Sequence, residues 1–166
     1  LSSEALNAYT MLLASGDYTM LQTWGETTLG MVTGNNKYFA LSPQRVAELG
    51  LAPSDLIPLS PPGSRHLRGL SFSKAALDEM GRNGSATWLF RPSGEPSPGG
   101  WAYIAAGEAT QVDAAYKCRV RKPWWRVPYL APADLLLTYM NADTPRLSTN
   151  AARVSHLNSV HGVYLH

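Results

Sequence analysis

The stretch LGMVTGNNKYFALSP, residues 29–43, decides how the first half of the chain is expected to fold. Apolar residues lie on both sides of Gly34-Asn35-Asn36, and glycine and asparagine tolerate the positive φ angles of tight turns. The pattern therefore predicts a β-hairpin with strands over residues 28–33 and 37–41. Ser42-Pro43 is typical of a helix start, because serine caps the first turn and proline fits its first position.

The rest of the pattern predicts a mixed α+β domain of short strands and helices with extensive loops. Residues 92–100 are rich in Pro, Gly and Ser and predict a flexible loop. Both halves are too small and irregular to be separate domains, so we expect one domain over residues 1–166. The expected helices cover residues 4–14, 42–50, 73–81 and 101–109. The expected strands cover residues 19–24, 55–59, 86–90, 135–139, 146–149 and 154–157, with a further element starting in 160–165.

Composition supports a folded core and gives no sign of a membrane partner. Hydrophobic residues make up 45% of the 166 residues, with five Trp and eight Tyr. No apolar run approaches the roughly 18 residues that span a bilayer, and no signal peptide is visible. A single cysteine, Cys118, leaves no internal disulfide or thiolate zinc site and favours the reducing cytoplasm.

The charge is unevenly distributed along the chain, although the net charge is only +2. Residues 1–60 hold two basic and five acidic residues, whereas residues 61–166 hold twelve basic and seven acidic ones. Residues 116–126 contain five cations and no acid. Such a patch indicates either an anionic partner or a solvated edge strand that Lys and Arg protect from aggregation. Charge alone does not separate the two.

The basic segment YKCRVRKPWWRVP, residues 116–128, has the spacing expected of a phosphate-binding strand. If it is extended, Lys117, Arg119 and Arg121 share one face at intervals of about 6.6–6.8 Å, a step similar to that between phosphates. Of the two adjacent tryptophans, one is expected in the core, while the other could stack under Arg126 or against a sugar. The candidate DNA contacts in this segment are Lys117, Arg119, Arg121, Lys122, Trp124 and Arg126.

Two further segments carry polar groups suited to base edges. The expected hairpin tip offers two carboxamides and an ammonium, and Asn can pair with adenine while Lys meets phosphate or guanine. The segment RLSTNAARVSHLNSVHGVYL, residues 146–165, is dense in Ser, Asn and His. The candidates here are Asn35, Asn36, Lys37, Asn158, Ser159 and His161.

These three segments, in this order, resemble the C-terminal target-recognition region of the gamma-class, TaqI-like adenine DNA methyltransferases. The resemblance implies a fold that clamps double-stranded DNA and reads the bases beside the target adenine, largely from the major groove. It also implies a separate N-terminal domain of the same protein that binds S-adenosylmethionine and methylates the flipped adenine. Residues 1–16 are then expected to form a helical linker from that domain.

Catalytic and cofactor sites are not expected within this chain. Amino-group DNA methyltransferases use an Asn or Asp followed by Pro-Pro and an aromatic ring, whereas Ser60-Pro61-Pro62-Gly63 has no ring and predicts a turn. No glycine-rich loop for S-adenosylmethionine follows a strand. We therefore expect no bound cofactor, no metal site and no methylation by this chain alone. His156 and His161 are five residues apart, a spacing that suits neither a helical nor a strand metal pair.

Several alternatives remain open from the sequence. The recurrent segments could be scaffold or phosphate contacts, with the loops over residues 58–68 and 93–99 reading the bases. A second possibility is a protein-interaction module that uses exposed aromatics such as Trp124. A third is a hydrolase that uses Ser155 or Cys118 with a histidine, although no nucleophile-elbow motif supports it.

Overall fold

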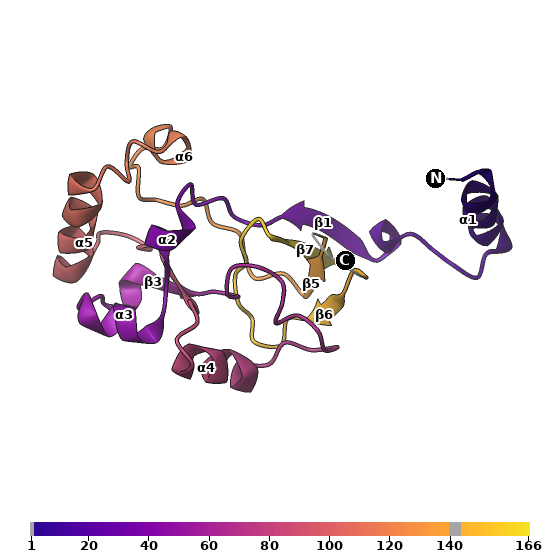
Figure 1. Cartoon of the computed structure of the whole chain (residues 1–166), viewed down its shortest axis with the longest axis horizontal. Coiled ribbons are helices and arrows are strands. Elements are labelled where there is room, and N and C mark those ends of the chain that lie inside the picture. The colour runs from indigo at the N-terminus through magenta and orange to yellow at the C-terminus, as the bar shows by residue number, and fades with distance from the viewer. Residues whose placement is uncertain (1, 140–143) are drawn as a thin grey trace.

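The computed structural model describes residues 2–139 and 144–166, which form a mixed α+β domain as predicted (Figure 1). The helices of these residues are α1 (Ser3–Ser15), α2 (Asn36–Phe39), α3 (Pro43–Glu48), α4 (Lys74–Arg82), α5 (Pro98–Ala109) and α6 (Tyr116–Arg119), with 3-10 turns η1 (Leu21–Thr23) and η2 (Pro53–Asp55). The strands are β1 (Gly25–Leu29), β2 (Ala40–Leu41), β3 (Leu56–Pro58), β4 (Trp88–Phe90), β5 (Leu135–Thr138), β6 (Leu147–Thr149) and β7 (Val160–Leu165).

The strands form two antiparallel sheets. The four-stranded sheet has the order β1-β7-β5-β6, so the first and last strands of the chain are neighbours, with Gly25 opposite Leu165 and Leu29 opposite His161. The three-stranded sheet has the order β2-β4-β3. Figure 1 shows α2, α3, α5 and α6 gathered at the end of the molecule that holds the small sheet, while α1 lies beyond the opposite end.

Two hydrophobic cores follow from this arrangement. The larger one joins the small sheet to the surrounding helices, and Phe39 and Phe90 are completely buried there. The smaller one lies between α4 and the four-stranded sheet, around Leu77, Leu136 and Val154. Burying one such side chain stabilises the fold by about 1.5–3 kcal/mol, so both sheets depend on the helices that cover them.

Serine caps begin the predicted helices where the sequence indicates. The side chains of Ser42 and Ser73 accept hydrogen bonds from the third backbone N–H beyond them, at 3.2 Å in each case. Ser97 caps α5 in the same way, so the predicted 92–100 loop ends three residues early. The buried carboxylate of Asp55 accepts from the Ser97 N–H at 2.9 Å and from its hydroxyl, which anchors this loop.

The predicted hairpin at residues 28–41 is wrong. The side chain of Asn35 accepts from the backbone N–H of Tyr38 at 3.2 Å and starts helix α2 in place of a turn between strands. Of the expected returning strand over residues 37–41, only Ala40–Leu41 is a strand. The expected strand over residues 19–24 does not form, because residues 21–23 form a 3-10 turn. Residues 154–157 form no strand either, but two isolated parallel bridges at Ser155 and Leu157.

Helix α1 forms as predicted, yet it packs on nothing that the structure describes. Ser2 caps its start and Gly16 ends it with a left-handed φ of 77°. None of its residues is buried, and its apolar side chains face solvent. These exposed side chains are Leu6, Tyr9, Met11, Leu12 and Leu13. Over the described part of the chain, neither α1 nor another helix has the length and apolar character to cross a membrane.

The imidazole of His156 fills a space between two glycines. It is fully buried, and a Cβ on Gly162 would come within 2.5 Å of its Cε1, while one on Gly30 would come within 2.7 Å of its Cδ2. Neither ring nitrogen has a hydrogen-bond partner among the described residues. Burial lowers the pKa of His156 to about 4, and it lowers the pKa of His66 to about 4 as well.

These two histidines predict a loss of stability in mild acid. Because both are harder to protonate when folded, the unfolded chain takes up more protons between pH 6.5 and 4, and stability falls as pH drops through this window. At pH 5 each histidine should lower the free energy of unfolding by about 2 kcal/mol relative to pH 7.5. Urea denaturation of His66→Gln should show about half of the total drop, and an unchanged drop would contradict the assignment of His66.

Candidate nucleic-acid interface

The basic segment folds as a short helix and not as the predicted extended strand. The N–H groups of Cys118 and Arg119 both donate to the Ala115 carbonyl, at 2.8 and 3.0 Å, and form α6. Cys118 is completely buried, so the helix packs its thiol face inward. Helical spacing separates side chains that alternation would align. The prediction that Lys117, Arg119 and Arg121 share one face is therefore wrong.

Arg121 holds the loop before α2 in place. Its Nη2 atom donates to the carbonyls of Val32 and Thr33, each at 2.7 Å, and its guanidinium lies 6.0 Å from the Phe39 ring centroid. Burial lowers the pKa of Arg121. The Cys118 thiol also contacts the Thr33 carbonyl, at 3.6 Å. The second candidate segment is thus bonded directly to the first.

Five cations remain exposed around this junction, of which Arg126 lies over the Trp125 ring. We call the other four the cationic rim: Lys37, Lys117, Arg119 and Lys122. Within residues 2–139 and 144–166, no carboxylate forms an ion pair with any of them. Gly34 brings two parts of the rim together, because a Cβ there would come within 2.9 Å of the Lys117 Cβ. Lys117 and Arg119 both lie over the ring of Tyr116, 5.5 and 5.6 Å from its centroid. The rim is therefore a set of positive charges that no salt bridge of these residues compensates.

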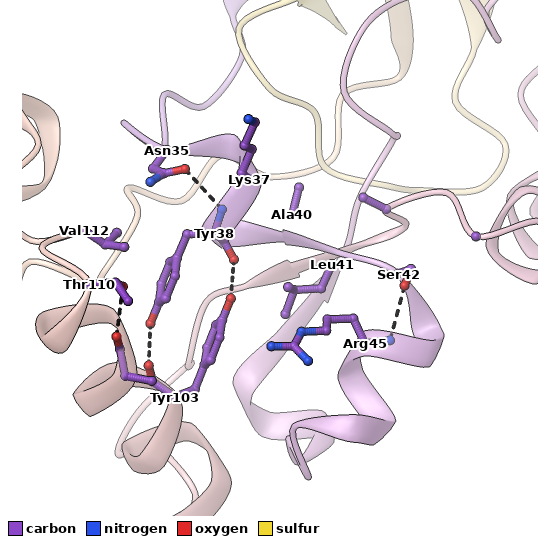
Figure 2. Close-up of a pocket in the computed structure, with 13 residues that line it drawn as sticks. Asn35, Lys37, Tyr38, Ala40, Leu41, Ser42, Arg45, Tyr103, Thr110 and Val112 are labelled. Carbon is purple, nitrogen blue, oxygen red and sulfur yellow. Dashed lines mark hydrogen bonds between the residues drawn. The ribbon is translucent and has the colours of Figure 1, made fainter.

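Two hydrogen-bonded tyrosines hold the backbone that directly follows Asn35, Asn36 and Lys37. Tyr38 and Tyr103 each donate their hydroxyl to the other's carbonyl, at 2.9 and 2.7 Å, with rings stacked 4.4 Å apart. Burial raises the pKa of Tyr103 to about 12 and that of Tyr38 above its usual range, so both hydroxyls stay protonated donors. They stand in a hollow of about 750 Å³, and Figure 2 shows Lys37 extending away from the paired rings.

The third candidate segment meets the same loop. The N–H of Asn158 donates to the Met31 carbonyl at 3.1 Å, and Asn158 shares a shallow hollow of about 450 Å³ with residues 32–37. Ser159 accepts a hydrogen bond from the Gly63 N–H at 3.0 Å. His161 is half-buried against the Tyr139 ring, 4.4 Å away. Asn35, Asn36, Lys37 and Asn158 therefore lie together, whereas His161 is occupied by an aromatic contact.

The two tryptophans of the basic segment are both engaged inside the domain. Trp125 belongs to the core at 5% exposure, and Arg126 lies over its ring, 5.1 Å from the centroid. Trp124 is half-buried, donates its Nε1–H to Glu108 at 3.0 Å and packs against Tyr38. Arg126 therefore stacks on Trp125, the tryptophan in the core, and not on Trp124.

No acyl-transfer site is assembled by the described residues. His156 makes no hydrogen bond to Ser155 or Cys118, and burial raises the pKa of the Cys118 thiol. Ser60 and His66 do form a pair at 2.8 Å, which the sequence did not suggest. However, Ser60 is only 2% exposed, and in the part of the chain that the structure covers no carboxylate hydrogen-bonds to His66. The same residues contain no group of three potential metal ligands.

The arginines at positions 119 and 121 should respond differently to substitution. Arg121→Met removes two charge-assisted hydrogen bonds, so we expect it to lower the free energy of unfolding by roughly 1.5–3 kcal/mol. Arg119→Ala, at an exposed position, should change it by no more than about 0.5 kcal/mol. Urea denaturation measures both, and equal effects would show that Arg121 does not hold the loop.

Comparisons with known proteins identify the family. Residues 1–166 match the family described as Type II methyltransferase M.Eco57I, C-terminal domain. The chain is 23% identical to Type II methyltransferase M.AccI of Acinetobacter calcoaceticus over 139 residues. These residues are 84% of this chain and 26% of M.AccI. The chain is 40% identical over 63 residues to Type II methyltransferase M.XamI of Xanthomonas campestris pv. amaranthicola, covering 38% and 12% respectively. The chain spans a minor part of these relatives, and it belongs to the family of M.Eco57I-type C-terminal domains of Type II methyltransferases.

Proposed function

We propose that this chain is the sequence-specific DNA-recognition domain of an adenine-specific DNA methyltransferase and does not methylate DNA on its own. The observation that carries the proposal is the cationic rim, four exposed charges to which no carboxylate outside residues 1 and 140–143 is paired. One of them, Lys37, lines a hollow together with the carboxamides of Asn35, Asn36 and Asn158. Uncompensated cations attract the phosphate backbone, and carboxamides can pair with adenine edges. Membership of a Type II methyltransferase family supports DNA as the partner.

The candidate residues then divide into two groups by their surroundings. Lys37, Lys117, Arg119 and Lys122 are exposed and form the group proposed to reach phosphates, with Lys117 and Arg119 lying over the exposed Tyr116 ring. Asn36 and Asn158 line the hollow beside Lys37 and are proposed to meet base edges. The Asn36 Oδ1 atom accepts from the Thr33 hydroxyl, so the amide N–H groups of Asn36 are what it would offer to a base. The others stabilise the surface from within, since their polar groups already have partners or their rings are packed. The residues of this supporting group are Asn35, Arg121, Trp124, Arg126, Ser159 and His161.

The methyl-transfer chemistry would reside in another part of the same protein. M.AccI and M.XamI, the two Type II methyltransferases, are several times longer than the segments matched here. The exposed apolar side chains of α1 fit a role in which this helix links or docks the recognition domain to an N-terminal catalytic domain that binds S-adenosylmethionine. The duplex would then be held between the two domains, in the cytoplasm of a bacterial cell with a restriction-modification system.

Arg119→Ala in the full-length protein should weaken binding to every duplex to a similar degree. A lost phosphate contact removes one released counterion, so the slope of log K against log salt should become shallower by about 0.9. Fluorescence anisotropy with labelled duplexes at several salt concentrations measures both effects. The matched control is Arg82→Ala, an exposed arginine at the end of α4, which should change neither. Unchanged affinity and slope for Arg119→Ala would remove it from the interface.

Docking of α1 has its own test in the full-length protein. Leu6→Ser combined with Leu13→Ser should expose the connection over residues 17–24 and speed its cleavage by chymotrypsin, because the helix would lose its apolar contact with the catalytic domain. Leu70→Ser is the control, since Leu70 is 89% exposed and lies outside α1. Equal cleavage rates in all three proteins would contradict docking through these leucines.

A further inference from the structure

The loop over residues 61–70 is held rigidly at both ends. Before it, the Ser60 N–H donates to the Ser155 carbonyl at 2.8 Å, and after it the Thr149 N–H donates to the Leu70 carbonyl at 2.9 Å. Between them Leu67 is only 1% exposed and belongs to the smaller core. A loop anchored in this way loses little conformational entropy when it contacts a ligand.

Side-chain contacts also fix the backbone on each side of Arg65. The Gly63 N–H donates to the Ser159 hydroxyl at 3.0 Å, and His66 bonds to Ser60 at 2.8 Å and packs on Phe72. Arg65 lies between these contacts, is exposed, and has no carboxylate partner among the residues that the structure describes. The loop therefore presents a charged guanidinium from a defined backbone position.

A hollow of about 900 Å³ opens beside Arg65. Polar groups of Ser64, Arg65, Ser85 and Ser159 line it. Ser159 directly follows Asn158, which lines the hollow around residues 32–37. The two hollows therefore each include a residue of the same turn, at consecutive positions.

We infer that Arg65 is a base-reading residue that selects a guanine in the recognised DNA sequence, an inference that rests on the proposed function. The planar guanidinium fork matches the O6 and N7 acceptors of guanine, and such pairing needs a donor held in a fixed place. Phosphate contact makes no such demand, and the exposed cations of the rim already serve it. In this assignment the rim supplies affinity for any DNA, and the loop supplies specificity for its sequence.

The test compares wild-type full-length protein with Arg65→Lys, Arg65→Gln and the control Arg82→Gln. Each protein selects duplexes from a pool with a randomised core, the retained DNA is sequenced, and affinities for single base-pair substitutions are then measured. Wild type and Arg82→Gln should prefer one G·C pair by roughly 5- to 150-fold, and Arg65→Gln should lose this preference at that position alone. Arg65→Lys should weaken the preference without abolishing it, because an ammonium can contact guanine but lacks the planar fork. Arg65→Lys should also keep the wild-type salt dependence, because its charge remains.

Two results would overturn the assignment of Arg65. One is an unchanged recognised sequence in both variants, and the other is a uniform loss of affinity with a shallower salt slope in Arg65→Gln, which identifies a phosphate contact. If Arg119→Ala still weakens binding to all duplexes, the proposed function stands without this inference. If wild-type protein selects no sequence and binds no duplex, both the proposed function and the assignment of Arg65 are wrong. Circular dichroism checks that each variant is folded.

Discussion

The hydrogen bonds from Arg121 to the carbonyls of Val32 and Thr33 hold the basic segment against the loop before α2, and the candidate interface depends on them. The loop over residues 30–35 belongs to no sheet, so the carbonyls of Val32 and Thr33 need partners from elsewhere. A guanidinium can supply both from one side chain, and it brings the 116–126 segment against residues almost ninety positions earlier. Asn158 approaches the same loop from the other side through the Met31 carbonyl. These hydrogen bonds, together with the contact of the Cys118 thiol with the Thr33 carbonyl, hold the three segments against one another.

The sequence predicts local structure well where one signal dominates. Ser42, Ser73 and Ser97 begin helices because a hydroxyl is the best available partner for free N–H groups at a helix start. Gly34-Asn35-Asn36 is ambiguous, because asparagine favours both left-handed turns and helix caps. Burial of Tyr38 and Phe39 decides in favour of the cap, and that is a tertiary effect which the local pattern does not contain.

The candidate site was predictable in composition but not in arrangement. Its residue types stand out in the sequence, and Lys37, Lys117, Arg119 and Lys122 are exposed in the fold. The alternation that aligned them was misleading, because the N–H groups of Cys118 and Arg119 bond to the Ala115 carbonyl and close a helical turn. The engagement of Arg121 and Trp124 within the domain depends on contacts with distant residues. The rigid path of the 61–70 loop likewise depends on Ser155, Ser159 and Thr149.

The helical form of residues 116–119 bears on why the cations are there. Lysine and arginine on an edge strand are explained by the need to block pairing with another sheet. This segment has no strand edge to protect, so that explanation does not apply to it. Among the residues described by the structure, no carboxylate pairs with these four like charges, so their mutual repulsion raises the free energy of the folded domain. An anionic partner would reverse the sign of that contribution, and the phosphate backbone of the DNA that we propose as partner is strongly anionic.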